Sequence, residues 1–167
     1  MGTTETQTAR EVVGEYFDAL AARDPDRAVK TWKEGGVDDL FGFGEMVAPE
    51  GIRDYFAGLF AAIPDWQFEV LDMVAEGNEV AVHWRARGTF TGEGKLEGFV
   101  ANGRSVDMRG LDLLTVEDGK IVSNFAYTNA MELARQLGAM PPSGSPQEKA
   151  MAAAFNAKTA LMKRFGR

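Results

Sequence analysis

The chain of 167 residues contains no cysteine and a single histidine. Without cysteine it can form neither a disulfide nor a thiolate nucleophile, which suits a cytoplasmic protein. Transition-metal sites are usually built from histidine and cysteine, so none is expected here. This composition leaves open only a metal held by carboxylates alone. Because the usual ligands are almost absent, we expect no metal and no cofactor.

Long apolar runs and an excess of positive charge are also missing. No apolar stretch approaches the roughly 18 residues that a membrane span needs. The N-terminal sequence MGTTETQTAR lacks the basic start and apolar core of a signal peptide. The formal net charge of −7 argues against a nucleic-acid-binding surface. We expect one cytoplasmic domain with neither a nucleic-acid nor a membrane partner.

Charge is unevenly distributed along the chain. From Pro146 onward a single acid, Glu148, stands against five basic residues: Lys149, Lys158, Lys163, Arg164 and Arg167. The tail therefore has a net charge of +4, and the remainder has a net charge of −11. Such a tail can bind its own acidic body or a second subunit.

The spacing of apolar residues predicts helices at both ends of the chain. Thr8 and Glu11 have the spacing of a capping box, and the helix behind them should end near residues 24–25. Residues 26–32 and 49–63 predict two more helices. Residues 130–137 predict a short helix closed by Gly138, and an apolar stripe marks a final helix beyond the linker.

Between these helices the pattern is typical of strands. Residues 66–75, 79–91, 104–116 and 120–128 alternate or run apolar, with the hairpin signals EGNE and EDGK between them. Residues 36–47, GVDDLFGFGEMV, predict a short strand or a loop under a helix. Helices followed by an antiparallel meander predict an α+β fold, with helices on one face of a curved sheet. A cone of this kind leaves an apolar cavity between helices and sheet.

Five segments, in this order, resemble a known family: EYFDALAARDPD, PEGIRDYFAGLFAAIPDWQFEV, VAEGNEVAVHWRARGTFTG, LDLLTVEDGKIV and ARQLGAMPP. They are similar to the SnoaL-like polyketide cyclases of the nuclear-transport-factor-2-like (NTF2-like) superfamily, over roughly residues 9–142. The resemblance implies an NTF2-like domain over 1–142, with a cone-shaped antiparallel sheet and helices on its concave face. A linker (143–146) and a C-terminal amphipathic helix (147–167) follow.

The family hosts cyclases, isomerases, epoxide hydrolases, cofactor-free hydroxylases and binding modules, so the fold does not settle the reaction. The chain departs from the family pattern at two positions. Phe90 stands in GTFTG where the family commonly has a histidine. Asn129 stands where the cyclases carry an aspartate that acts as general acid and base.

Strand alternation assigns side chains to the two faces of the sheet. The apolar sets should face the cavity, namely Val80, Val82, Trp84, Ala86 and Phe90, then Met108, Gly110, Asp112, Leu114 and Val116, then Ile121, Ser123, Phe125, Tyr127 and Asn129. Their polar members Asp112, Ser123, Tyr127 and Asn129 are site candidates. The opposite parity places His83, Arg85, Arg87 and Arg109 on the outer face.

Asp112 is the one charged residue in its apolar set, so burial should raise its pKa. A protonated carboxyl can donate a hydrogen bond to an enolate, as a protonated aspartate does in ketosteroid isomerase. By resemblance to that related family, Tyr16 would be the second donor. Enolate chemistry also needs a base. The related isomerases carry their base on the first short strand, where this chain offers Asp38 and Asp39. By this resemblance we prefer Asp39, with a solvated turn as the alternative for both.

Asn129 directly precedes a predicted helix, with Glu132 three residues later, as in an N-cap with a reciprocal acid. An amide can cap the helix and orient a ligand, but it cannot transfer the proton that the family aspartate transfers. A flat hydrophobic ligand would contact the following side chains, unless they serve only as core: Trp32, Phe41, Phe43, Phe60, Trp84, Phe90, Met108, Phe125 and Tyr127.

Three functions follow in order of preference. The first is a cofactor-independent enzyme acting on a hydrophobic, carbonyl-bearing ring compound by aldol cyclisation or enol isomerisation, using Tyr16, Asp112 and Asn129. The second is a non-catalytic binding or assembly module that kept the cone and lost the base. The third is water addition in the manner of the epoxide hydrolases of this fold. A homodimer through the outer sheet face is expected from the habits of the fold.

Overall fold

A computed structural model describes residues 7–96 and 98–165. The first helix, α1 (Ala9–Ala21), begins at the predicted capping box. The Thr8 hydroxyl accepts a hydrogen bond from the Glu11 backbone N–H at 3.3 Å, and the Glu11 carboxylate accepts one from the Thr8 N–H at 2.8 Å. Helices α2 (Pro25–Val29) and α3 (Glu50–Ala62) follow close to their predicted positions.

Six strands form the main sheet, in the order β2-β1-β8-β7-β4-β3. Their bounds are Trp32–Leu40 for β1, Gly44–Val47 for β2, Gln67–Glu76 for β3, Glu79–Thr89 for β4, Ser105–Glu117 for β7 and Lys120–Thr128 for β8. Strands β1 and β8 run parallel, and the other neighbours are antiparallel. Residues 36–47, expected as a strand or loop, thus supply part of β1 and all of β2. A small hairpin that the sequence did not predict pairs β5 (Lys95–Leu96) with β6 (Phe99–Val100).

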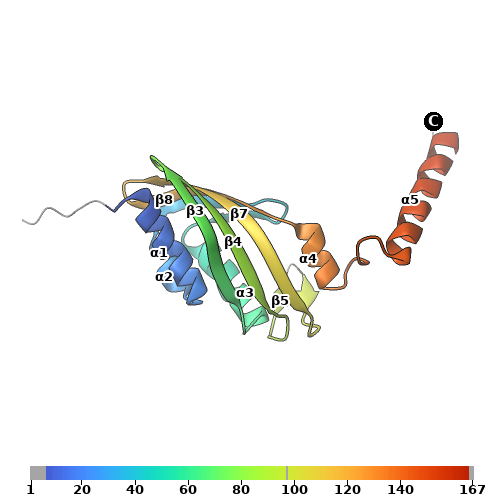
Figure 1. The fold of residues 1–167 in the computed structure, drawn as a ribbon, viewed down its shortest axis with the longest axis horizontal. Coiled ribbons are helices and arrows are strands. Elements are labelled where there is room, and N and C mark those ends of the chain that lie inside the picture. Colours follow the sequence, from blue (N-terminus) through green and yellow to red (C-terminus); the bar gives the residue numbers. More distant parts are fainter. Residues whose placement is uncertain (1–6, 97, 166–167) are drawn as a thin grey trace, which may run out of the picture.

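The helices α1, α2 and α3 cover one side of the curved sheet, and the hydrophobic core lies between these layers (Figure 1). Apolar side chains of α1 pack there against the inner residues of β4 and β7. A second cluster joins the end of α3 to the β5 region and to Leu137 after helix α4 (Ala130–Gln136). The predicted α+β architecture, with helices on one face of the sheet, is confirmed.

One irregularity in β8 decides which side chains enter the interior. Strand β7 pairs Thr115 with Ser123 but pairs the next residue, Val116, with Ile121. Strand β8 therefore carries one extra residue at Val122, which is a bulge. Beyond a bulge the alternation of side chains is reversed, because each residue is moved to the opposite face.

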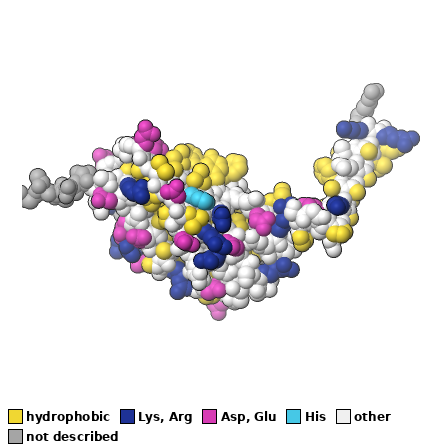
Figure 2. Space-filling view, viewed as in Figure 1, with side chains coloured by type: hydrophobic (Ala, Val, Ile, Leu, Met, Phe, Trp, Pro, Cys, Tyr) yellow, Lys and Arg dark blue, Asp and Glu magenta, His cyan; other side chains and the backbone are white. Residues whose placement is uncertain are grey.

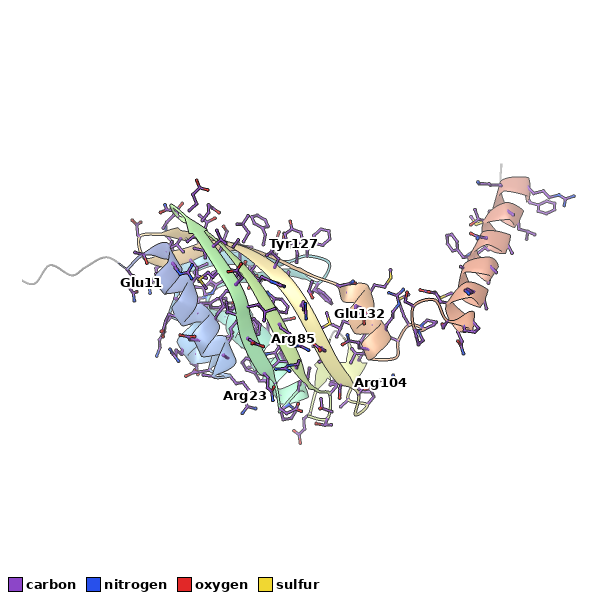
Figure 3. All side chains as sticks on the ribbon, in the orientation of Figure 1. Glu11, Arg23, Arg85, Arg104, Tyr127 and Glu132 are labelled. Carbon is purple, nitrogen blue, oxygen red and sulfur yellow. The ribbon has the colours of Figure 1, made fainter. Side chains whose placement is uncertain are left out.

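The reversal overturns the predicted inner face of β8. Asn124 is 1% exposed and faces inward, whereas Phe125 and Tyr127 are 46% and 50% exposed. Tyr127, labelled in Figure 3, lies on the side of the sheet away from α3. The prediction that Ser123, Phe125, Tyr127 and Asn129 line the cavity is therefore wrong. The predicted inner sets of β4 and β7 are confirmed by their burial.

The chain ends in helix α5 (Pro146–Phe165), which stands apart from the body beyond α4 (Figure 1). It has no buried residue. Across 7–96 and 98–165, none of the helices combines the length and the apolarity needed to cross a bilayer.

Candidate functional site

A cavity of about 100 Å³ lies between the helices and the inner face of the sheet. Its walls are mainly apolar and aromatic, with side chains from α1, α3, α4 and the strands β1, β4, β7 and β8. The polar side chains at its surface include Tyr16, Asp38, Asp112 and Thr128. A small number of polar groups in an apolar hollow is the usual composition of a small-molecule site.

One amide joins the two carboxyl groups of this cavity. The Asn124 side-chain N–H₂ donates to Asp38 Oδ1 at 3.0 Å and to Asp112 Oδ2 at 3.0 Å. The Tyr16 hydroxyl donates to Asp38 Oδ2 at 3.4 Å, and the Trp84 indole N–H donates to Asp112 Oδ1 at 2.7 Å. The five side chains thus form one continuous network on the cavity wall.

The sheet topology brings these residues together from distant parts of the chain. Asp38 on β1 lies directly beside Asn124 on β8, and Asp112 on β7 lies beside Ala126, two residues further along β8. All of them point inward, because residues two apart in a strand share a face. Three neighbouring strands therefore place the amide between the carboxyls.

Gly110 makes room for the indole in this network. It is paired with Trp84 across β4 and β7, and a Cβ at position 110 would lie 2.1 Å from the Trp84 ring. Such a separation is far inside van der Waals contact. The missing side chain lets the ring lie across β7, so that its N–H reaches Asp112 two residues further along.

The two carboxyls have unlike proton affinities. Burial raises the pKa of Asp38 to about 8, and the nearby Asp112 carboxyl adds to the rise. Burial also raises the pKa of Asp112, to about 6, while the hydrogen bonds from Trp84 and Asn124 oppose that rise. The pKa of Asp38 is thus raised further than that of Asp112, so Asp38 is the carboxyl that keeps its proton to higher pH. The predicted upward shift at Asp112 has the predicted cause, which is desolvation.

Tyr16 is anchored in the core by its ring. It is 1% exposed and meets the rings of Phe17, Trp32 and Phe56 edge-on. Burial, followed by the charges of Asp38 and Asp112, holds the pKa of its hydroxyl well above the usual range. Tyr16 therefore stays a hydrogen-bond donor at any physiological pH.

One polar atom of the network, the buried Asn124 amide oxygen, has no hydrogen-bond partner among the described residues. Leaving such an atom unpaired costs roughly 1–3 kcal/mol. The structure accepts this cost next to the cavity, and residues that break a local rule in this way are frequently functional.

The predicted site residues fall into three groups. Tyr16, Asp112, Phe43, Trp84 and Met108 line the cavity, as expected. Trp32, Phe60 and Phe90 instead belong to the packed core behind it. Phe41, Phe125 and Tyr127 lie on the outer face, where Phe41 stacks beside Tyr127 with ring centroids 5.4 Å apart.

Asp39, which the sequence analysis preferred as the base, does not line the cavity. Asp38 is 2% exposed and faces the cavity, so its neighbour Asp39 faces away. Two adjacent acids in a short strand do not by themselves show which of the two faces the interior. Asp38 shares its parity with Trp32 and Gly36, which are also buried in β1.

Asn129 is the N-cap of α4, as predicted. Its side-chain oxygen accepts the Glu132 backbone N–H at 3.0 Å. The expected reciprocal bond from Glu132 is replaced by one in which the Glu132 carboxylate accepts the Gln136 amide at 3.1 Å. Asn129 is exposed and does not line the cavity. The amide therefore removes no proton donor or acceptor from the interior.

Sequence reasoning missed Asn124 entirely. Alternation counted from Ile121 leaves Asn124 out of the inner set, because the sequence does not predict the bulge at Val122. A polar pair, Ser123-Asn124, following the apolar pair Ile121-Val122 breaks the period of two, and this break is the available signal. Within the described ranges, no group of three or more acidic or histidine side chains is arranged to hold a metal ion.

Comparison with known proteins places this geometry in a family. The model of the SnoaL-like polyketide cyclases matches residues 10–137. No curated protein sequence matches the chain.

Solved structures share the fold over most of their length. IdmH from Streptomyces antibioticus is 25% identical with a TM-score of 0.65, covering 79% of this chain and 99% of its own. AclR from Streptomyces galilaeus is 24% identical with a TM-score of 0.69, covering 95% and 98%. A SnoaL-like protein from Jannaschia sp. CCS1 is 22% identical with a TM-score of 0.71, covering 84% and 100%. The chain belongs to the SnoaL-like polyketide cyclase family.

Proposed function

We propose that the protein is a cofactor-independent enzyme that forms an enolate of a cyclic or cyclising carbonyl compound, for aldol ring closure or double-bond isomerisation. The observation that carries this proposal is the pair of buried carboxyls on one cavity wall, joined by Asn124. Two titratable groups whose environments separate their pKa values are suited to acid and base roles in one reaction.

Asp112 is the base in this proposal. Its pKa of about 6 leaves it ionised at neutral pH, and its two hydrogen-bond donors favour the ionised form. It would remove a proton from the carbon next to the substrate carbonyl. The electrons of the broken C–H bond then move to the carbonyl oxygen, which becomes an enolate oxygen.

Asp38 and Tyr16 are the donors to that oxygen. With a pKa of about 8, Asp38 keeps its proton at neutral pH. The 3.4 Å distance between the Tyr16 hydroxyl and Asp38 Oδ2 is long for a hydrogen bond between oxygens, so both groups can turn to a closer acceptor. The assignment reverses the role expected for Asp112 from the sequence and moves the donor to Asp38.

The second half of the reaction returns the proton. In isomerisation, the acid formed at Asp112 protonates the distal carbon of the dienolate. In aldol closure, the enolate carbon attacks a second carbonyl, a C–C bond forms, and the new alkoxide takes the proton. Both routes balance without a redox partner or an added reactant.

The shape of the cavity supports a small hydrophobic ring as the reacting unit. Its volume of about 100 Å³ is somewhat below the roughly 150 Å³ of an engineered cavity that binds benzene. A carbonyl-bearing ring would therefore enter with its carbonyl end toward the carboxyls, while the rest of the substrate would occupy the mouth. The apolar walls keep water from the enolate.

Deuterium incorporation tests the proton-transfer step without knowledge of the natural substrate. The protein would be incubated in D₂O with monocyclic and bicyclic ketones, and NMR would follow exchange of the protons next to the carbonyl. Removing a general base typically costs a factor of about 10²–10⁴ in rate. We expect a loss of this size for Asp112→Asn.

Asp39→Asn is the matched control. It neutralises the acid next to Asp38 but on the other face of β1, so exchange should continue at the parent rate. Equal exchange by the parent protein and Asp112→Asn would refute the assignment. A ligand that binds in the cavity without exchange by any variant would instead establish a non-catalytic binding module.

A further inference from the structure

Helix α5 carries an apolar stripe that is largely exposed in the described part of the chain. The stripe consists of Met151, Phe155, Leu161, Met162 and Phe165, which are 46% to 73% exposed. Figure 2 shows hydrophobic side chains on the surface of the isolated helix. A lone helix of 20 residues is only marginally stable in water, so such a stripe normally packs against a partner.

A second exposed apolar surface lies on the outer face of the sheet. We call it the outer patch, and it comprises Phe41, Val74, Leu111, Leu113, Phe125 and Tyr127. The strand register makes it continuous, because Leu111 is paired with Tyr127 and Leu113 with Phe125. In Figure 2, hydrophobic side chains gather on the body over the upper parts of β3 and β7.

The start of α5 is fixed so that the helix leaves its own body. The Glu148 carboxylate accepts from Arg135 of α4 at 2.6 Å and from the Gly144 backbone N–H at 2.6 Å. The Arg135 and Glu148 side chains are only 16% and 26% exposed, which strengthens their pairing. The Arg135–Glu148 pair, which ties α5 to α4, would have to break if α5 folded back onto its own outer patch.

We propose that α5 packs across the outer patch of a second copy of this chain, and that the two copies exchange helices reciprocally. A two-fold axis would let each helix meet the patch of the other copy with the same contacts. Each copy then supplies both halves of the interface, so the contact closes and does not extend into a filament.

Charge favours this occupant. The segment from Pro146 has a net charge of +4, and the rest of the chain has −11. Lys158 lies within the apolar stripe, between Phe155 and Met162. The opposite net charges of the tail and the body attract two copies at long range and give the association a dependence on salt, whereas the outer face itself carries both signs, with Arg85 paired to Asp107 and Arg87 to Glu69.

The available area is sufficient for a stable dimer. With exposures of 46% to 73%, and about 150–250 Å² for a large aromatic side chain, one stripe offers on the order of 500 Å². Two helices and their two receiving patches would bury on the order of 2,000 Å² in total. Stable interfaces bury about 1,200–2,000 Å².

Sedimentation analysis of the full chain tests the exchange. We expect a dimer for the parent protein, and a shift to monomer for Phe155→Asp, for Met162→Asp and for Leu113→Asp. Ala160→Asp is the matched control, because it adds the same charge on the opposite side of α5 and should remain dimeric. Circular dichroism of each variant would establish that the body is folded.

Crosslinking tests the pairing itself. The chain has no cysteine, so a mixture of Phe155→Cys and a mass-tagged Leu113→Cys offers single reactive sites to a short bis-maleimide. We expect a mixed crosslinked dimer, which should be absent when Ala160→Cys replaces Phe155→Cys. A monomeric parent would overturn the proposal, since α5 would then serve a different partner. A dimer that survives Phe155→Asp and Met162→Asp but not Leu113→Asp would also overturn it, in favour of sheet-to-sheet packing.

Discussion

Asp38→Asn should change the dependence of stability on pH. The unfolded Asp38 loses its proton above about pH 4, whereas the native carboxyl keeps it up to about pH 8. Between these values the native state binds more protons than the unfolded state, so the free energy of unfolding falls as pH rises. The amide has nearly the same shape, can still accept from Asn124, and has no charge to bury.

The size of the effect follows from the shift. Each pH unit within this window lowers the free energy of unfolding by about 1.4 kcal/mol. Asp38 should therefore lower the stability of the parent protein by about 2 kcal/mol between pH 6 and pH 8. Asp112, with a pKa of about 6, is already half ionised at the lower end and adds less than about 0.5 kcal/mol. The free energy of unfolding of Asp38→Asn should therefore be nearly constant between pH 6 and pH 8. At pH 8 it should be higher than that of the parent protein.

Urea unfolding at both pH values, followed by tryptophan fluorescence, measures these free energies. Asp39→Asn provides the comparison, because that neighbouring carboxyl faces away from the cavity. It should keep most of the slope of the parent protein, because the charge of Asp39 is the smallest of the causes that raise the pKa of Asp38. Parallel pH dependences for the parent and Asp38→Asn would refute the assignment of a raised pKa to this buried carboxyl.

The remaining predictions concern neighbouring features. Gly110→Ala should lower the free energy of unfolding by about 1–3 kcal/mol and shift the tryptophan emission, because its Cβ would overlap the Trp84 ring; an unchanged urea midpoint would contradict the tight contact. Asn129→Ala should cost about 1 kcal/mol by loss of the α4 N-cap, whereas Asn129→Asp should cost almost nothing and leave exchange of ketone protons unchanged. Proton exchange should itself rise with pH through about 6, as Asp112 ionises, and fall through about 8, as Asp38 ionises; a profile without the second limb would remove Asp38 from the mechanism.

The fold was predictable because its signals are local and redundant. The capping box at Thr8 and the alternation in β4 and β7 each specify an element from a few adjacent residues. The same alternation placed Asp112 and Trp84 correctly at the cavity. Tyr16 was placed by resemblance, and the helical pattern around it agrees.

The site was only partly predictable because its key residues lie beside backbone irregularities. Asp38 follows a register shift in β1, and Asn124 follows the bulge in β8. Parity counted from Ile121 fails at the bulge in β8, since one extra residue inverts every later side chain. In β1 the parity is kept from Trp32 to Asp38, but the adjacent acids do not show which of them faces inward. The pairing of Asp38 with Asn124 also joins residues 86 positions apart, which no local pattern reports.

The bulge at Val122 has a consequence for how this cavity can evolve. Deleting a single residue there would slide the rest of β8 by one position and exchange its two faces. Tyr127 and position 129, where related cyclases carry their acidic residue, would turn toward the interior, and Asn124 would leave the carboxyl pair. One codon thus separates two chemically different linings on the same sheet, so insertions and deletions in this hairpin offer a short route between activities.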